Sequence, residues 1–265
     1  MNSILRDGIH RANYRACVGL LVVMAALPAA MSAESPPIDP AIQAAVDSPD
    51  RPAKDRARDA KRHYAEVLQF FGVRPGMTLI ELFAAGGTTA EVLSRAVGPG
   101  GKVYMQNPPF FYERFGTKDV DERLANNRLP NVVRLDRPLN DLKLPPNSLD
   151  GAVAMMVLHD FFWLSPDVPG VLRDLRTALK PGAWFGVVDH SAPPGTGAEM
   201  AMDREKGTHR IDEEYVKKLF ADAGFVLESS NDALRNPADD RTKPFFAPDM
   251  RDKPTDRFVL KFRKP

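Results

Sequence analysis

The sequence predicts an α/β fold: a seven-stranded, mostly parallel, doubly wound sheet of the Rossmann-like kind. Short apolar runs of strand length alternate with amphipathic helical stretches from residue 54 to residue 265. A small, glycine-containing turn joins the first run to the first helix after it. The fourth run is apolar almost throughout, as expected of a parallel strand that is buried on both faces. Together these observations favour a parallel sheet with helices on both sides.

The first strand and its turn form a recognisable unit. MTLIELF, residues 77–83, is the first predicted strand, and the turn AAGG follows it. A helix over 88–98 begins directly after the turn, because Thr88 and Glu91 have the spacing of a capping box. GKVYMQN, residues 101–107, is the second strand. Strand, glycine turn, helix and strand in this order are the first half of a nucleotide-binding α/β fold.

The same alternation continues along the chain. Five further strands are expected at 131–136, 149–161, 183–190, 225–232 and 256–264. Further helices are expected at 54–71, 119–127, 168–182 and 211–225. The last two strands have no helix between them.

The connection between those last two strands, residues 233–255, contains four prolines and is unusually long. It carries charged residues beside Phe245 and Phe246. Charged and aromatic groups together suit a lid that excludes water from the substrate side of a site. A disordered insertion is the alternative.

Residues 1–33 have the layout of a secretory signal peptide. Three arginines precede an apolar run over 16–27, and small residues end at Ala33, where cleavage is expected. The run is shorter than the ~20 residues that span a bilayer, and a buried N-terminal helix is the alternative. No twin-arginine pair is present, so the chain is expected to cross unfolded and to be periplasmic or secreted. Residues 34–53 then form a loose N-terminal arm and 54–265 one domain.

Charge and cysteine content exclude several partners. Without the signal peptide, the 36 basic and 35 acidic residues become 33 and 34, a formal net charge of −1. Proteins that bind nucleic acid usually carry an excess of basic residues, so this chain is not expected to bind nucleic acid. The only cysteine, Cys17, lies in the predicted signal, which leaves no disulfide and no thiolate metal site. No stable membrane insertion is expected after cleavage.

Over residues 54–265 the chain resembles the class I S-adenosylmethionine-dependent methyltransferases. The resemblance depends on IELFAAGGTTAEVL, LDGAVAMMVLHD and LKPGAWFGVVDH. More narrowly, the chain is similar to a family of predicted exported bacterial methyltransferases of unknown substrate, through RPGMTLIEL, VDHSAPPGTG, THRID and LRNPADD. The resemblance implies that S-adenosylmethionine is the cofactor and that a methyl group is transferred to a small molecule.

Two other functions remain open. A non-catalytic exported module that keeps the fold and binds a ligand is the second hypothesis. A nicotinamide-dependent oxidoreductase is the third, and the absence of a G-x-G-x-x-G turn counts against it.

The resemblance also implies a cofactor site at the first turn. The family has an acid followed by glycines two, four and six positions later, whereas only the last of these glycines is present here and another stands beside it. Small residues still let the backbone approach a ligand, and the following helix presents free N–H groups. The residues expected at the cofactor in this turn are Glu81, Ala85, Gly86, Gly87 and Thr88.

Two further cofactor contacts are expected at strand ends. Asn107-Pro108-Pro109-Phe110 matches a loop of amino-group methyltransferases, but it follows the second strand instead of the fourth. The wider class places a ribose-binding acid there, so Asn107 is predicted to hold the ribose while the prolines stiffen the turn. Asp136, after the third strand, matches the position that contacts the adenine amino group. A turn role for Asn107 and a loop cap for Asp136 are the alternatives.

Three histidines are predicted to be catalytic. His159 ends the fourth strand and His190 the fifth, while His209 begins the next helical segment. Strand carboxyl ends meet at the ligand-binding crevice of such sheets, where a histidine can take a proton from a hydroxyl or amine acceptor. His159 and Asp160 are also expected at the cofactor, and a purely hydrogen-bonding role for His159 is the alternative. No metal is predicted, because tight ligand spacing such as H-x-x-x-H is absent.

Overall fold

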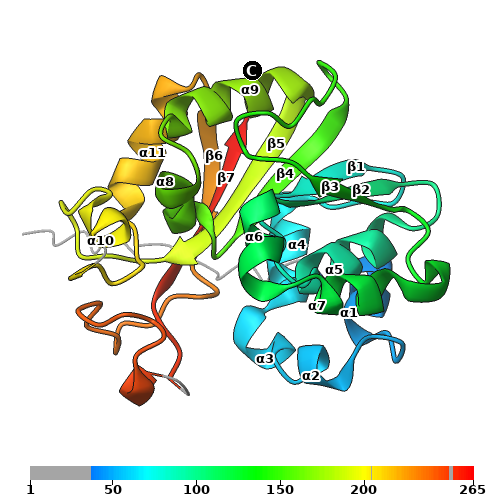
Figure 1. Ribbon diagram of the computed structural model, residues 1–265, viewed down its shortest axis with the longest axis horizontal. Helices are drawn as coiled ribbons and strands as arrows, with labels where there is room; N and C mark the ends of the chain where they lie inside the picture. Colours follow the sequence, from blue (N-terminus) through cyan, green and yellow to red (C-terminus); the bar gives the residue numbers. More distant parts are fainter. Residues whose placement is uncertain (1–36, 204, 251–252) are drawn as a thin grey trace, which may run out of the picture. The chain divides into compact units, whose positions relative to one another are not determined.

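The computed structural model describes residues 37–203, 205–250 and 253–265, so the predicted signal peptide lies outside the described residues. Seven strands form one sheet in the order β3-β2-β1-β4-β5-β7-β6 (Figure 1). They are β1 Thr78–Glu81, β2 Lys102–Asn107, β3 Val132–Asp136, β4 Leu149–Met155, β5 Leu179–His190, β6 Val226–Asn231 and β7 Arg257–Arg263. Each overlaps one of the seven predicted strands.

The sheet is mixed, which corrects the prediction that it is mostly parallel. The pairs β1 with β2, β1 with β4, β2 with β3 and β4 with β5 are parallel. β7 runs antiparallel to both of its neighbours, β5 and β6. A parallel pair needs a crossover connection, usually a helix, and β6 and β7 have none between them. The chain therefore turns back, and β7 enters the sheet in the opposite direction.

Helices cover both faces of the sheet (Figure 1). One core lies between the sheet and α9 and α11, and the other between the sheet and α1, α4 and α5. Neighbouring strand residues alternate between the two cores, as Leu79 and Ile80 do, because successive side chains point to opposite faces. The helices are α1 Pro40–Asp47, α2 Ala53–Arg56, α3 Asp59–Arg62, α4 Tyr64–Phe71, α5 Thr88–Val97, α6 Pro109–Phe115, α7 Lys118–Leu124, α8 Phe161–Leu164, α9 Val168–Ala178, α10 Glu199–Met202 and α11 Glu213–Asp222.

The segment predicted to be a loose arm contains helix α1, which corrects that prediction. The Asp39 carboxylate accepts a hydrogen bond from the Ala41 backbone N–H at 2.8 Å, and Pro40 occupies the first turn. Ile42 and Ala45 are each only 2% exposed and pack in the same core as α4 and α5. The apolar positions of this helix were hidden in the sequence by the prolines and acidic residues around it.

Two predicted elements have different bounds in the structure. The helix expected over 54–71 is divided into α2, α3 and α4, with His63 in the left-handed region at φ 48° between the last two. The fourth strand ends at Met155, and residues 158–160 form a short 3₁₀ turn that leads into α8. His159 and Asp160 therefore lie beyond the strand and are positioned by this turn.

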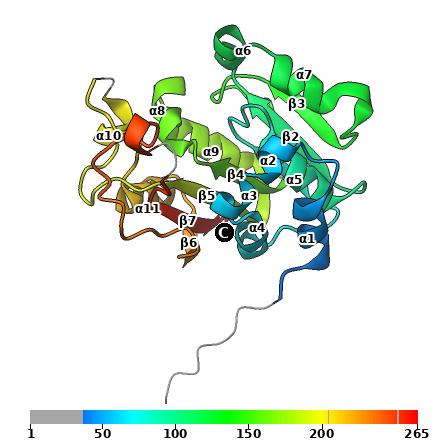
Figure 2. The same cartoon turned by 90° about the horizontal axis from the view of Figure 1, so that it is seen from below.

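The long connection between β6 and β7 is ordered in its described part. Among the described residues of this connection, the 3₁₀ turn Pro248–Met250 is the only helical element, and the connection lies on the same side of the molecule as α10, away from α7 (Figure 1, Figure 2). None of the helices in the described residues has the length and apolar character needed to cross a membrane.

Candidate functional site

A cavity of about 340 Å³ lies at the carboxyl ends of β1, β4 and β5. This volume falls in the range of roughly 300–1,000 Å³ that is typical of small-molecule sites. Its position also matches the ligand-binding edge of open α/β sheets. It is lined by Lys54, Asp55, Arg58, Arg62, Glu81, Phe83, Ala84, Ala85, Gly86, Thr88, Thr89, Asp119, Arg123, Met155, Met156, Val157, His190 and Phe245. Of the predicted site residues, the cavity brings together Glu81, Ala85, Gly86, Thr88 and His190.

Glu81 is the buried acid of the cavity. It ends β1 and is 4% exposed. Burial raises the pKa of its carboxyl group to about 8, although the Thr89 hydroxyl and the Ala90 backbone N–H favour the ionised form. Its Oε2 is buried with no hydrogen-bond partner among the described residues. A buried polar atom without a partner is costly, so this oxygen is ready to meet a ligand.

Gly87 shapes the turn but does not line the cavity. It is the N-cap of α5 at φ 76°, and a Cβ there would lie 2.5 Å from the Met105 sulfur. The predicted capping box is wrong, because no side chain caps this helix start. The Glu91 side chain instead points to three arginines.

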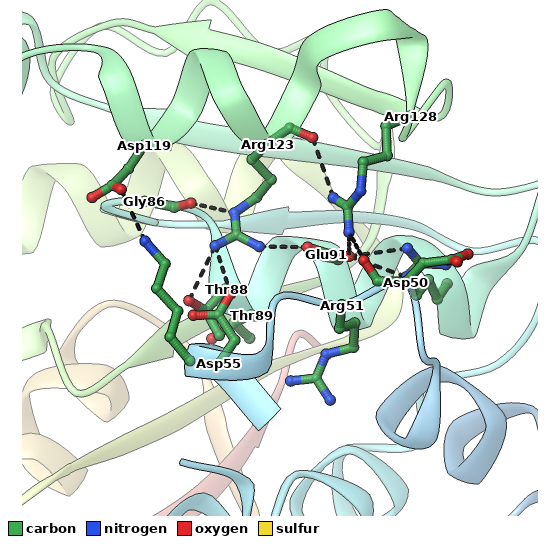
Figure 3. A network of polar contacts seen from close by, with 12 residues as sticks. Asp50, Arg51, Asp55, Gly86, Thr88, Thr89, Glu91, Asp119, Arg123 and Arg128 are labelled. Carbon is green, nitrogen blue, oxygen red and sulfur yellow. Dashed lines mark hydrogen bonds and ion pairs between the residues drawn. The ribbon is translucent and has the colours of Figure 1, made fainter. Parts of the chain in front are cut away.

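Those arginines form an ion-pair network with Glu91 beside the cavity (Figure 3). The fully buried Glu91 carboxylate forms ion pairs with Arg95 at 3.0 Å and with Arg123 and Arg128. Arg123 also pairs with Asp55 at 2.7 Å and donates to the Gly86 carbonyl oxygen. The pKa of Glu91 is lowered, because the guanidinium groups outweigh its burial. The network joins α2, α5 and α7, and so it holds the glycine turn in place.

Asn107, predicted to hold the ribose, makes its side-chain hydrogen bonds within the protein, as in the alternative of a turn role. Its Oδ1 accepts from the Ala85 backbone N–H at 2.8 Å. Its Nδ2 donates to the Ala85 carbonyl oxygen at 2.9 Å and to the Tyr112 hydroxyl at 3.2 Å. The side chain is fully buried and lies outside the cavity lining. Asn107 therefore clamps the first turn from the second strand.

Asp136, predicted at the adenine, and the two prolines also lie outside the lining of this cavity. Asp136 pairs with Arg134 at 2.6 Å and does not line the cavity. Pro109 begins helix α6, where its missing N–H costs nothing. The two prolines therefore follow strand β2 and also start a helix.

The three predicted histidines lie together, and two of them contact Asp189. The His159 ring centroid is 6.0 Å from that of His190 and 5.8 Å from that of His209. The fully buried Asp189 accepts from His159 Nδ1 at 2.7 Å and from the backbone N–H groups of His159 and His190. Burial disfavours a charged His159, but the Asp189 and Asp160 carboxylates outweigh it and raise its pKa. His159 and His209 do not line the main cavity.

His190 faces the cavity in a different state. Burial, together with His159 and nearby arginines, lowers its pKa well below the ordinary 6.5. Its Nδ1 is 2.7 Å from the Thr255 hydroxyl oxygen. Because the ring is neutral at pH 7, it can accept a proton.

Phe245 covers the histidines from the long connection. Its ring stacks on the His190 ring, with the ring centroids 4.3 Å apart. It lies edge-on to the rings of His159 and His209, with centroid distances of 5.8 and 6.3 Å. The connection is anchored by the buried ion pair of Arg210 with Asp239 at 2.8 Å. The segment predicted as a lid thus places an aromatic ring against the site.

A second cavity of about 300 Å³ adjoins the first. Both cavities are lined by Arg58, Arg62, Met156, His190 and Phe245. The second one also has Lys61, Lys253 and Arg257 in its lining. Arg257 is 7% exposed, and its Nε has no hydrogen-bond partner among the described residues.

Sequence reasoning missed the basic residues of both cavities. Arg58 and Arg62 come from a charge-rich stretch whose helical period is broken at His63, so no regular face indicated where they point. Arg257 stands at the start of a strand. Its position at the start of a strand, at the edge of the sheet where ligands bind, was the only feature of the sequence that could have indicated this role.

Comparison with known proteins gives sequence relatives of limited extent. No protein-family model matches the chain. It is 27% identical over 127 residues to the 2-phytyl-1,4-naphtoquinone methyltransferase of Trichormus variabilis, covering 48% of this chain and 52% of that protein. It is 25% identical over 190 residues to a ubiquinone/menaquinone biosynthesis C-methyltransferase of a Shewanella species, covering 62% and 71%. The match to the first relative spans about half of that protein's length.

Solved structures share the fold. A SAM-dependent methyltransferase from Aquifex aeolicus has a TM-score of 0.58 and 21% identity, covering 79% of this chain and 93% of that one. The [4+2]-cyclase SpnF has a TM-score of 0.57 and 17% identity, covering 80% and 81%. The chain therefore has the fold of the S-adenosylmethionine-dependent methyltransferases and is similar in sequence to methyltransferases.

Proposed function

We propose that the protein transfers a methyl group from S-adenosylmethionine to a small molecule. The observation that carries this proposal is the pair of adjoining cavities at the carboxyl ends of the strands, with His190, Met156 and Phe245 in the lining of both. One cavity suits the methyl donor and the other the acceptor. Their shared wall is where the two reactants would meet.

The first cavity fits the chemical groups of S-adenosylmethionine. The unpartnered Glu81 Oε2 suits a cationic group, whose charge would favour the carboxylate form. Arg58 and Arg62 suit the donor's carboxylate. Phe83 and Met155 provide apolar surface for a nucleoside. The residues present therefore match both charges and the apolar part of this cofactor.

The chain's own part in the reaction is alignment and proton removal. S-adenosylmethionine supplies a methyl group on a positively charged sulfur, so the protein must hold an acceptor atom in line with it. His190 lines both cavities and is neutral at pH 7, so it can take the proton of a hydroxyl or amine acceptor. Phe245 covers His190 and keeps water from it.

The second cavity favours an acceptor with negative charge. Its described lining has no acidic residue and contains the basic residues Arg58, Lys61, Arg62, Lys253 and Arg257. A phenolate or carboxylate would balance these charges. Because two relatives are named as methyltransferases of naphtoquinone and ubiquinone or menaquinone synthesis, hydroxylated quinone precursors are the first acceptors to test.

The export expectation belongs to the same proposal. The mature protein would work in the periplasm or outside the cell, after cleavage near Ala33. S-adenosylmethionine would then have to reach it there.

Calorimetry with S-adenosylmethionine and S-adenosylhomocysteine tests the proposal, with one molecule bound per chain as the expected result. Gly86 lines the cavity, and a side chain there would meet Asp119. Gly86→Leu should therefore block binding. Gly100→Leu is the matched control, because nothing lies within 4 Å of a Cβ at that position.

Transfer of labelled methyl groups to quinol and phenolic acids then separates an enzyme from a non-catalytic module. Turnover that depends on His190 supports the proposal. Cofactor binding without transfer to any of these acceptors favours the non-catalytic module. A folded protein that binds neither compound refutes methyl transfer from S-adenosylmethionine and favours a module for another ligand.

A further inference from the structure

His159, Asp160 and His209 form a second chemical group beside the cavities. The ligand atoms that the three side chains offer all lie within 4.8 Å of one another. Asp160 Oδ1 is 3.6 Å from His159 Nε2 and 3.7 Å from His209 Nδ1. We propose that these three side chains bind a divalent transition-metal ion, with Zn²⁺ as the expected species. This proposal goes beyond methyl transfer and does not depend on it.

The distances suit an ion between the three groups. Ligands at ~2.1 Å from a tetrahedral ion are separated by about 3.4 Å, so small side-chain movements would close the site. At 3.6 and 3.7 Å the groups are too far apart to be hydrogen-bonded to one another. Two imidazoles and one carboxylate form a donor set typical of zinc and related ions, whereas Mg²⁺ and Ca²⁺ prefer oxygen ligands.

Asp189 orients the first ligand. It lies 2.7 Å from His159 Nδ1, and its oxygens also accept from two backbone N–H groups. With Nδ1 donating to Asp189, the lone pair of His159 is on Nε2, the nitrogen that faces Asp160. A carboxylate behind a ligating histidine is the usual outer partner of a metal site. Asp189 is fully buried, so this orientation is fixed by the core.

The site has access and an open coordination position. The Asp160 and His209 side chains are each 27% exposed. Three protein ligands leave one tetrahedral position for water or a ligand. Phe245 contacts the rings of His159 and His209 and lines both cavities. The ion would therefore lie one aromatic ring away from the proposed acceptor cavity.

Zinc binding to the chelator-treated protein tests the proposal by calorimetry. The expected result is one Zn²⁺ per chain and no binding of Mg²⁺. Asp160→Asn and His209→Gln should each weaken Zn²⁺ binding by at least 10-fold, and Asp189→Asn by about 10–100-fold. His63→Gln is the matched control, because His63 is exposed and pairs with Glu66, and neither residue belongs to the proposed metal site. Circular dichroism verifies that each variant is folded.

Spectroscopy gives a second, site-specific measurement. The Trp163 ring is 5.3 Å from His209, so its fluorescence should change as the ion binds. Co²⁺ in place of Zn²⁺ should give the strong visible absorption of a four-coordinate ion, and Asp160→Asn should remove it. Absence of Zn²⁺ binding, equal affinity in the ligand variants, or an equal loss in His63→Gln would overturn the proposal.

Discussion

At the scale of single residues, Glu81 is a carboxyl group that folding removes from water. Burial raises its pKa from 4.5 to about 8. Its contribution to stability is therefore fully present below pH 4.5 and is lost as the pH rises through 8. Between these values the free energy of unfolding of the ligand-free protein should fall by up to about 1.4 kcal/mol per pH unit. Glu81→Gln, which cannot ionise, should show a shallower decline in urea unfolding from pH 5 to 8.

The exposed Glu113 supplies the control for that experiment. Glu113→Gln should keep the wild-type dependence on pH. If Glu81→Gln also keeps it, Glu81 does not have the raised pKa in the folded protein.

Gly87 permits a second prediction at this scale. An alanine there meets two penalties: a left-handed backbone at φ 76° and a Cβ 2.5 Å from the Met105 sulfur. Gly76 has a similar φ of 83° but nothing within 4 Å of a Cβ. Gly76→Ala should cost about 1 kcal/mol of unfolding free energy from backbone strain, and Gly87→Ala at least 1 kcal/mol more. Equal losses in urea unfolding would show that the Met105 side chain moves aside freely.

The sequence indicated which strand ends meet but not how each side chain is used. Glu81 and His190 are at the cavity because strand ends are set by hydrophobic runs, which are visible in the sequence. The hydrogen bonds of the Asn107 amide to the Ala85 backbone were not predicted, because this contact is decided only when two strands pair. The convergence of Asp160 and His209 is likewise tertiary, since 48 residues separate them.

At the scale of elements, the connection between β6 and β7 is the part expected to respond to ligand. Trypsin should cut it after Arg241, and saturating cofactor with an acceptor analogue should slow this cleavage. Phe245→Ala should lose the protection, because Phe245 is the aromatic side chain of the connection that lines the cavities. Phe246→Ala is the matched control, since Phe246 is 55% exposed and outside both linings. Cleavage rates that ligand leaves unchanged would contradict a lid.

Elements with a strong apolar pattern were predicted best. All seven strands were found, and most of them are runs of buried residues between turns, although β3 and β6 at the sheet edges contain no fully buried residue. The helix expected over 54–71 was found as three short helices, since its charges follow no single helical face and the break at His63 depends on a left-handed backbone. The direction of β7 could have been inferred from the missing crossover helix.

At the scale of the whole molecule, export remains a prediction about residues outside the described part of the chain. Intact mass of protein recovered from the periplasm should show the loss of the first 33 residues. The physical reason is the order of charged, apolar and small residues, which signal peptidase requires. Replacing Ala33 with a bulky residue should leave the precursor uncleaved. A full-length product in the cytoplasm would contradict export.

The position of β7 has a consequence for synthesis. Residues 257–263 pair on one side with β5 and on the other with β6, so the seventh strand in chain order is an interior strand of the sheet. Until it emerges, β6 has no partner strand and β5 has only β4, and the core that contains Phe258, Leu260 and Phe262 stays open. A nascent chain of this design cannot complete its fold early, because its decisive contacts are formed with residues translated much earlier. Until residues 257–263 have emerged, a chain of this design would remain open enough to pass through a translocation channel.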